Sequence, residues 1–169
     1  PSAEYPWPWS ITRYLPGRPI GAAALSGRAG LAAADPLADF LSALHGPAPT
    51  GAPFNPFRSV PLADRGDSVA ARLPGAPSDL RASLATAWGH ALEAPGPAGP
   101  STWVHGDLHG LNVLAARGRL TGVLDFGDLC AGDRATDLAA GWFLLDRPAR
   151  ERLRLALGTD DATWARGRG

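Results

Sequence analysis

Two short apolar segments that each end in polar residues constrain the fold of this chain more than any other feature. The first ends at Val104 and leads into a loop in which Asp107 and Asn112 lie five residues apart. The second runs over residues 120–124, and Asp125 follows it directly. Short apolar runs bounded by glycine and polar residues are typical of buried strands. The sequence therefore predicts two carboxylates and one amide at the ends of strands.

The spacing of these polar residues is that of a kinase active site. In protein kinases a loop Asp accepts the proton of the substrate hydroxyl, a later Asn binds metal, and a second Asp before Phe-Gly also binds metal. Here Asp125-Phe126-Gly127 matches that last motif letter for letter, whereas Gly106 stands where protein kinases carry Arg. His-Gly-Asp-Leu-His-x-x-Asn at residues 105–112, with Asp-Phe-Gly-Asp at 125–128, resembles the aminoglycoside phosphotransferase family of small-molecule kinases.

This resemblance implies an α+β, protein-kinase-like fold that consists mostly of a helical C-terminal lobe with small β-hairpins. Residues 1–17 match the last strand of the N-terminal lobe and the hinge, and residues 18–169 match a C-terminal catalytic lobe truncated at its own C-terminus. The N-terminal lobe is therefore expected to be largely missing. The family transfers the γ-phosphate of ATP to a hydroxyl of a small molecule. Aminoglycosides are its eponymous acceptors, relatives use macrolides, homoserine, choline-like alcohols or sugars, and no residue here selects among them.

The resemblance also assigns roles to the polar residues. Asp107 becomes the base that receives the hydroxyl proton, and His105 orients the loop by hydrogen bonding. Asn112 and Asp125 offer the oxygen ligands that Mg²⁺ prefers, so ATP or GTP with Mg²⁺ are the implied cofactors. A lone Asp in a glycine-containing loop is more often a turn residue, but three polar groups at kinase spacing favour the active site. His109 lies near this site without an assigned role.

The N-terminal segment is rich in aromatic residues and prolines, which predict a strand leading into a linker rather than a helix. Matching residues 14–17, Tyr-Leu-Pro-Gly, to the hinge of the family places Thr12 behind the adenine. The Arg13 carbonyl and the Leu15 amide then form the edge that binds adenine, and Leu114 joins the nucleotide site. The alternative is an ordinary edge strand with packed tryptophans, but the catalytic loop downstream favours the hinge.

Apolar residues at helical spacing predict a mainly helical remainder. Within the Ala-rich segment 22–45, Asp35-Pro36 is expected to start a helix that ends at Gly46. The proline-rich residues 47–62 should form a surface loop. A helix is expected to start at Ser78, with one apolar face formed by Leu80, Leu84, Ala87, Trp88, Ala91 and Leu92. Further helices are expected at 64–73, 137–145, 148–157 and after Asp160-Asp161.

Three acidic residues follow the second motif: Asp128, Asp133 and Asp137. Asp137 matches a family residue that ties the metal-binding loop to a helix, which is a structural role. Asp133 fits helix capping and a place in the acceptor cleft equally well. The negative charge of the three residues is compatible with a polycationic acceptor such as an aminoglycoside.

The amino-acid composition argues against some classes of binding partner. All 16 basic residues are Arg and they balance 16 acidic residues, so the charge calls for neither nucleic acid nor an anionic membrane surface. The single cysteine, Cys130, fits a reducing compartment such as the cytoplasm. No apolar stretch reaches the length of a membrane span. The sequence leaves the oligomeric state and the choice between ATP and GTP open.

Family members also carry a phosphate-binding loop and a Lys on the N-terminal lobe. This chain contains no Lys, and Arg is a poor substitute for such a point charge. We therefore expect the chain alone to bind ATP weakly and to turn over little. A non-catalytic, pseudokinase-like binding module is the main alternative, and a metal-dependent hydrolase is a second. His105 and His109 have zinc-protease spacing, but Gly106 replaces the Glu that such a site needs.

Overall fold

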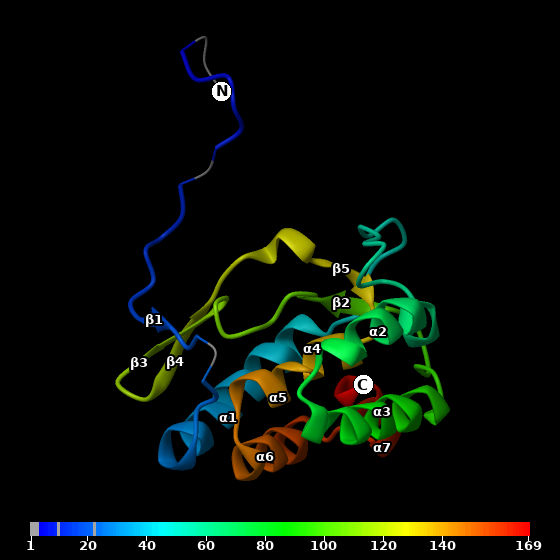
Figure 1. Cartoon of the computed structure of the whole chain (residues 1–169). Helices are drawn as coiled ribbons and strands as arrows, with labels where there is room; N and C mark the ends of the chain where they lie inside the picture. Colours follow the sequence, from blue (N-terminus) through cyan, green and yellow to red (C-terminus); the bar gives the residue numbers. More distant parts are fainter. Residues whose placement is uncertain (1–3, 10, 22) are drawn as a thin grey trace.

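The computed structural model describes residues 4–9, 11–21 and 23–169, and helices form most of its regular structure (Figure 1). The helices are α1 (Gly27–Leu44), α2 (Gly66–Arg72), α3 (Ser78–Glu93), α4 (Ala135–Leu138), α5 (Ala140–Leu144), α6 (Arg147–Leu157) and α7 (Asp161–Arg168). The 3₁₀ turns are η1 (Leu62–Arg65), η2 (Leu73–Gly75) and η3 (Phe126–Asp128). The strands are β1 (Arg18–Pro19), β2 (Thr102–Val104), β3 (Val113–Ala116), β4 (Arg119–Val123) and β5 (Cys130–Gly132). The predicted mixture of helices and small antiparallel sheets is confirmed.

Two small sheets bring the polar loops together. β3 and β4 form a hairpin whose turn residues Arg117 and Gly118 both have positive φ, +52° and +72°. Positive φ at both central residues is what a two-residue type I′ turn requires. β1 pairs with the other edge of β3, while β2 and β5 form a separate antiparallel pair. At the open end of the hairpin the Leu124 N–H donates to the Asn112 carbonyl at 2.8 Å, so the two polar loops lie side by side.

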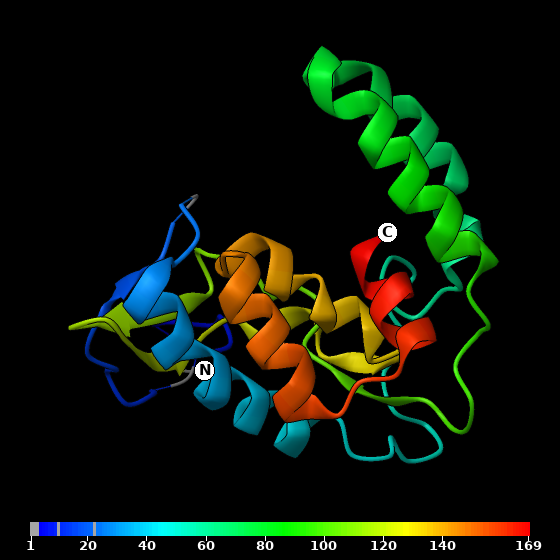
Figure 2. The ribbon, with the colours of Figure 1, turned by 90° about the horizontal axis from the view of Figure 1, so that it is seen from below.

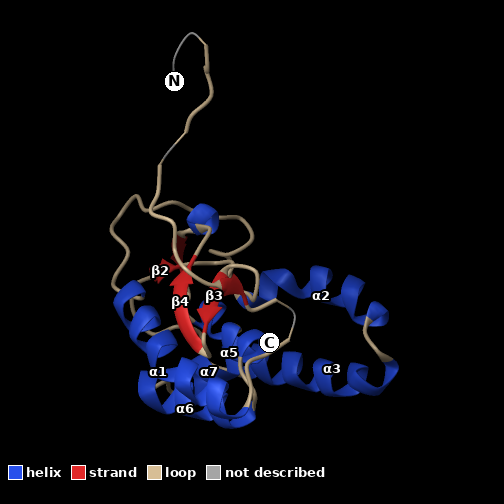
Figure 3. Ribbon diagram, turned by 90° about the vertical axis from the view of Figure 1, so that its left-hand side faces the viewer, coloured by secondary structure: helices blue, strands red, loops and turns tan. Residues whose placement is uncertain are grey.

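The core is built where α1 crosses α6 beneath the β3–β4 hairpin (Figures 1 and 3). Small side chains on α1 let the two helices approach closely, because alanines leave room for the leucines of the partner. The fully buried apolar residues of the two helices are Ala33, Ala34, Leu37, Leu41, Ala149 and Leu153. Farther along the chain α7 begins at the predicted cap, since Asp160 accepts hydrogen bonds from the backbone and the hydroxyl of Thr163. These bonds lower the pKa of Asp160 below its ordinary value.

The expected helix start at Asp35-Pro36 is wrong. α1 begins at Gly27, and Pro36 lies inside it. A proline inside a helix removes one backbone hydrogen bond, but burial of Ala34 and Leu37 on either side keeps the helix continuous. Asp35 instead forms a two-pronged ion pair with Arg152 of α6 at 2.8 and 2.9 Å, which lowers the pKa of Asp35. Tertiary packing thus overrides a local start signal.

The predicted helix from Ser78 is confirmed as α3, but its apolar face is not buried over most of its length. α2 and α3 lie side by side and project away from the rest of the molecule (Figure 2). Leu80, Leu84 and Leu92 are between 44% and 47% exposed, and Ala91 alone among the described residues of α3 is buried. Only the last turns of α3 reach α7. The remaining helices match their predicted positions, with 137–145 divided into α4 and α5.

The aromatic N-terminal segment does not form the predicted strand in the residues that can be described. Residues 4–9 and 11–17 contain neither helix nor strand, and β1 begins at Arg18. Trp7 and Trp9 are 68% and 61% exposed, so the alternative of an edge strand with packed tryptophans is also wrong. The segment extends away from the helices in Figures 1 and 3. The assignment of residues 1–17 to a hinge and 18–169 to a catalytic lobe stays a prediction.

The proline-rich segment after α1 is the irregular loop that the sequence predicts. It crosses the end of the smaller sheet, where the Ala131 N–H donates to the Pro53 carbonyl at 2.9 Å. This course brings residues near position 58 to the loop between β2 and β3, which is called the catalytic loop below after its predicted role. Among the described helices, none combines the length and the apolarity needed to cross a membrane.

Candidate active site

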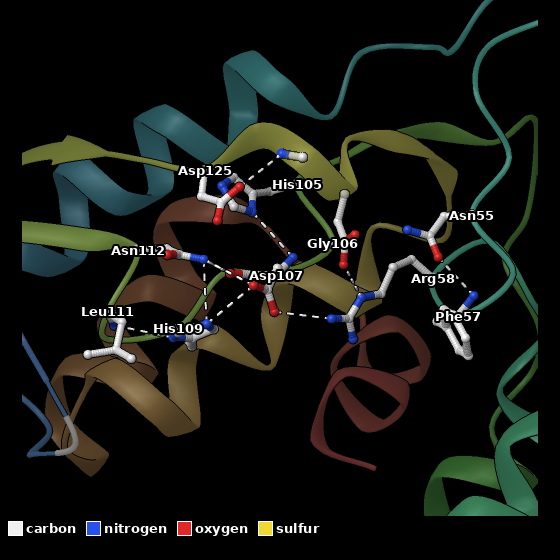
Figure 4. A network of polar contacts seen from close by, with 12 residues as sticks. Asn55, Phe57, Arg58, His105, Gly106, Asp107, His109, Leu111, Asn112 and Asp125 are labelled. Atoms are coloured by element: carbon white, nitrogen blue, oxygen red, sulfur yellow. Dashed lines mark hydrogen bonds and ion pairs between the residues drawn. The ribbon is translucent and has the colours of Figure 1, made fainter. Parts of the chain in front are cut away.

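Asp107 and Asn112 meet within the loop that joins β2 to β3 (Figure 4). The Asn112 side-chain amide donates to the Asp107 carbonyl at 2.9 Å and to its carboxylate Oδ2 at 3.1 Å. His109 Nε2 lies 3.3 Å from the same Oδ2. Asn112 is 9% exposed, whereas about a third of the Asp107 side chain reaches solvent. These two contacts hold one oxygen of the carboxylate, Oδ2, and the side chain remains accessible to a substrate.

His105 links the two polar loops through both ring nitrogens. The Asp107 N–H donates to Nδ1 at 3.2 Å, so the proton of the neutral ring sits on Nε2, which then donates to the Leu124 carbonyl at 2.9 Å. The side chain is completely buried. Its ring also packs against Phe126, with the ring centroids 4.8 Å apart. This geometry fits the orienting role expected for His105, because a buried ring with both nitrogens engaged has no access to substrate.

Asp137 anchors the start of the catalytic loop through hydrogen bonds to its backbone. Its Oδ2 accepts from the His105 backbone N–H at 2.8 Å, and its Oδ1 accepts from the Gly106 N–H at 2.9 Å. His45, at the end of α1, approaches Oδ2 at 3.1 Å. Asp137 is 1% exposed and lies on α4. The carboxylate thus satisfies buried backbone donors that have no strand partner, in keeping with the structural role that the resemblance implied.

The backbone conformation at position 106 explains why glycine stands there instead of the Arg of protein kinases. Its φ is +82°, a left-handed conformation that side chains disfavour. A Cβ at this position would lie 2.9 Å from the Asp128 carbonyl oxygen and 3.2 Å from the Asp128 Cβ. The loop therefore turns through a conformation and a gap that only glycine fits.

We expect Gly106→Ala to lower the free energy of unfolding by about 1–3 kcal/mol, because strained backbone of this kind costs that amount. Urea denaturation measures the change. Gly89→Ala in α3 is the matched control, since its Cβ would meet nothing and its φ is not positive. Replacing glycine in a helix should raise stability by about 0.5–1 kcal/mol. Equal effects of the two substitutions would contradict the account of Gly106.

Asp125 follows β4 in a left-handed conformation, with φ +59° and ψ +73°. Its Oδ1 accepts from the Gly127 N–H at 3.2 Å, and the side chain is exposed. The Phe126 ring contacts the rings of His105 and Phe40 but is still 43% exposed. The Asp-Phe-Gly segment therefore lies at the surface, with its carboxylate exposed and one side of its aromatic ring in contact with the protein.

The donor set of Asn112 and Asp125 fits magnesium. Both supply hard oxygen atoms, and Mg²⁺ in nucleotide sites is commonly held by one or two side chains together with phosphates and water. The Asn112 nitrogen is engaged by Asp107, which leaves the amide oxygen as the atom for a metal. Among the described residues no group of three or more His, Cys, Asp or Glu could hold a metal ion, so a zinc site of His105 and His109 has no support there.

Arg58 is part of this site, and the sequence reasoning missed it. Its guanidinium donates from Nη2 to Asp107 Oδ1 at 3.1 Å and from Nε to Asp128 Oδ2 at 2.9 Å. The residue lies in the irregular loop between α1 and η1, 49 positions before Asp107 and 70 before Asp128. No periodicity or motif surrounds it, so only the folded loop reveals the contact.

The other acidic residues near the site are neutralised. Asp133 accepts from the Ala135 N–H at 3.0 Å and pairs with Arg166 at 2.7 Å. Capping and an ion pair therefore account for Asp133, and of the two interpretations left open by the sequence the structural one has the better support. With Asp128 paired to Arg58 and Asp137 buried, the free negative charge expected to attract a polycation is largely used within the protein.

Two of the three residues predicted to bind nucleotide, Leu15 and Leu114, lie at the β3–β4 hairpin. Leu15 packs on Gly122, where an added Cβ would lie 2.5 Å from its Cδ1, and Leu114 pairs with Gly122 in the ladder. Leu114 is 6% exposed. Thr12 and Arg13 are exposed, in the segment that leads to this contact. The two leucines thus meet at one glycine.

A cavity of about 430 Å³ opens beside the catalytic loop. Its walls come from the turn after β1, from the catalytic loop and from α5, and the side chains are mainly apolar. The lining residues are Gly21, Ala24, His109, Gly110, Leu111, Trp142 and Phe143. His109 therefore contacts both this cavity and Asp107.

Comparison with known proteins gives one family match and several structural likenesses. The model of the phosphotransferase enzyme family matches residues 1–169. No curated protein sequence matches the chain. The similar solved structures include the GDP complex of aminoglycoside 2′-phosphotransferase-IIIa, with a TM-score of 0.64 and 19% identity over 92% of this chain and 57% of that one.

Two further solved structures have a similar fold. Macrolide 2′-phosphotransferase MphH from Brachybacterium faecium has a TM-score of 0.57 and 21% identity, covering 95% of this chain and 61% of its own. Aminoglycoside phosphotransferase APH(3″)-Id from Streptomyces rimosus has a TM-score of 0.55 and 22% identity, covering 89% and 63%. At these identities the likeness concerns the fold, and the predicted kinase-like fold is confirmed. The chain spans roughly three fifths of the length of these structures.

Proposed function

Because the chain belongs to the phosphotransferase enzyme family, as its motifs indicated, we propose that it moves the γ-phosphate of a nucleoside triphosphate to a hydroxyl of a small molecule. The observation that supports this proposal is that the loop carrying Asp107 and Asn112 lies beside the segment that carries Asp125. Asn112 contacts the Asp107 carboxylate at 3.1 Å, and the Leu124 N–H, just before Asp125, donates to the Asn112 carbonyl at 2.8 Å.

In the proposed reaction Asp107 accepts a hydrogen bond from the acceptor hydroxyl and takes its proton late in the transfer. The hydroxyl oxygen bonds to the γ-phosphorus as the bond from that phosphorus to the β-phosphate oxygen breaks, and the nucleoside diphosphate leaves. Asn112 and Asp125 would hold Mg²⁺, which supplies positive charge to the phosphates. His105 keeps the base loop and the Asp125 segment in one arrangement through its two hydrogen bonds.

ATP or GTP is the proposed phosphate donor. Structures with a similar fold were solved with streptomycin and ATP and with GDP. Arg13, Leu15 and Leu114 are the residues of this chain proposed to meet the base, with the packing of Leu15 and Leu114 about Gly122 as support. The single free Cys130 and the need for ATP fit a cytoplasmic site of action.

The proposed acceptor is a small alcohol of the kinds handled by similar proteins, which include a macrolide 2′-phosphotransferase and enzymes solved with gentamicin or kanamycin. The ion pairs of Asp128 and Asp133 leave little free negative charge to favour an aminoglycoside. The apolar cavity next to His109 is instead suited to an acceptor with an apolar face. We therefore include both antibiotic classes in the test.

The decisive experiment uses the protein expressed from its complete gene. It is incubated with Mg²⁺ and γ-labelled ATP or GTP, with and without a panel of aminoglycosides, macrolides and simple amino alcohols. We expect label to move to one acceptor class as a phosphate ester detected by mass spectrometry. The isolated chain of residues 1–169 is compared under the same conditions and should transfer far less.

The same experiment separates the alternatives. A thermal shift with nucleotide, but no transfer to any acceptor, would overturn the proposal in favour of a pseudokinase-like binding module. The absence of Lys from the chain is the observation that supports this alternative. Release of inorganic phosphate that does not depend on an acceptor would favour a metal-dependent hydrolase.

A further inference from the structure

Arg58 reaches the catalytic loop from a segment that no kinase motif includes. We propose that Arg58 is a positioning residue that fixes the carboxylate plane of Asp107 relative to the segment carrying Asp125 and Asp128. This inference rests on the proposed phosphate transfer, because it concerns the residue assigned there as the base. Figure 4 shows the guanidinium beside Asp107, on the side away from Asn112 and His109.

The two carboxylates are joined by different nitrogens of one rigid group. Nη2 contacts Asp107 Oδ1 at 3.1 Å and Nε contacts Asp128 Oδ2 at 2.9 Å. Because guanidinium is planar and its donors have a fixed geometry, simultaneous contacts from two nitrogens set the distance and the angle between the carboxylates. All three side chains are only about one third exposed, with fractions of 30%, 34% and 37% for Arg58, Asp107 and Asp128. The contact is therefore better sheltered than an ordinary surface ion pair.

Asp107 needs a second contact to hold its orientation. The torsion of an Asp carboxylate is broad and nearly two-fold, so one hydrogen-bonded oxygen does not fix the plane. Asn112 and His109 both approach Oδ2, whereas Arg58 is the described side chain that holds Oδ1. Removing Arg58 frees that oxygen to rotate away from the line of the acceptor hydroxyl.

The backbone holds Arg58 in place for this contact. The Arg58 N–H donates to the Asn55 carbonyl at 3.1 Å, and the Arg65 guanidinium donates to the Arg58 carbonyl at 3.4 Å. The aliphatic part of Arg58 lies over Gly106, where an added Cβ would be 3.1 Å from the Arg58 Cγ. Gly106 thus opens the space through which Arg58 approaches the base.

Lysine distinguishes geometry from charge at this position. An ammonium is a compact point charge and cannot make two contacts of fixed mutual angle. If charge alone mattered, Arg58→Lys would retain activity. If the planar bridge matters, Arg58→Lys should behave like Arg58→Ala.

The kinetic test compares Arg58→Ala and Arg58→Lys in the protein from the complete gene. We expect kcat to fall by about 100-fold in both, since displacement of a reacting group by about 1 Å costs that much, with little change in KM for the nucleotide. Free guanidinium ion should restore part of the activity of Arg58→Ala and none of Arg58→Lys. Arg152→Ala is the matched control, because it removes an Arg side chain that makes two carboxylate contacts remote from the site, both with Asp35. Its kcat should stay within about two-fold.

A second measurement does not depend on activity. In ¹⁵N spectra of the unaltered protein the Arg58 Nε–H should give a slowly exchanging signal that Asp128→Asn shifts and Arg152→Ala leaves unchanged. Full kcat in either Arg58 variant, or a rapidly exchanging Nε–H, would overturn this inference while the proposed function stands. Absence of transfer by the unaltered protein overturns the proposed function and the positioning role together, and the Nε–H signal then reports only a structural contact. A variant that fails to fold by circular dichroism is replaced by Arg58→Gln, for which the same loss of kcat is expected.

Discussion

Asp107→Asn should lower kcat for phosphate transfer by about 10²–10⁴-fold, the range that a general base contributes, and leave the fold intact. Asparagine has the same shape as aspartate and can still accept the hydrogen bond that Asn112 now donates to Oδ2 at 3.1 Å. It cannot accept a proton from the acceptor hydroxyl. Since Asn112 and Asp125 keep their oxygen atoms, KM for the nucleotide should change little. Steady-state kinetics with the acceptor found by the transfer experiment measures both constants.

Asp39→Asn is the control for this substitution. Asp39 lies exposed on α1, and the change of charge is the same. Its kcat should equal that of the unaltered protein. An Asp107→Asn protein that retains more than about a tenth of the activity would show that another group accepts the proton, and the assignment of the base would fail.

Asp137→Ala should have the largest effect on stability, with a loss of about 3–5 kcal/mol in the free energy of unfolding. The substitution leaves the backbone N–H groups of His105 and Gly106 buried without acceptors, and it removes the partner of His45. Each unsatisfied buried group costs about 1–3 kcal/mol. Because domains of this size are stable by only about 5–15 kcal/mol, much of the population should be unfolded at physiological temperature. Urea denaturation followed by circular dichroism measures the loss.

Two comparisons sharpen that result. Asp137→Asn retains one oxygen acceptor and should fall between the Ala variant and the unaltered protein. Asp39→Ala, at an exposed position, should change the free energy of unfolding by less than about 0.5 kcal/mol. A loss below about 1 kcal/mol in Asp137→Ala would mean that the catalytic loop finds other acceptors, contrary to the account given above.

The two polar loops were accessible to sequence reasoning because their positions follow from local patterns. Short apolar runs ending in polar residues predicted strands at β2 and β4, and the turn between β3 and β4 closes the distance between Asn112 and Leu124. The catalytic, metal-binding and nucleotide-binding roles themselves stay predictions.

The features that sequence reasoning missed depend on contacts between distant segments. Pro36 lies within α1 because residues on both sides of it pack in the core. Leu80 and Leu84 repeat at helical spacing, yet α3 projects into solvent over that part of its length. No sequence pattern surrounds Arg58, because it lies in an irregular loop and its partners, Asp107 and Asp128, are far away in the sequence. Periodicity reports which side of a helix is apolar and says nothing about what lies opposite.

The position of His105 has a consequence for how the site can change. One buried imidazole is bonded to the Asp107 backbone at one nitrogen and to the Leu124 carbonyl, just before Asp125, at the other. The two polar loops are therefore coupled, and a shift of either one is carried to the other. Arg58 adds a second link between them, because its guanidinium contacts Asp107 in one loop and Asp128 beside the other. A change in the distant loop that carries Arg58 would therefore reach both polar loops at once.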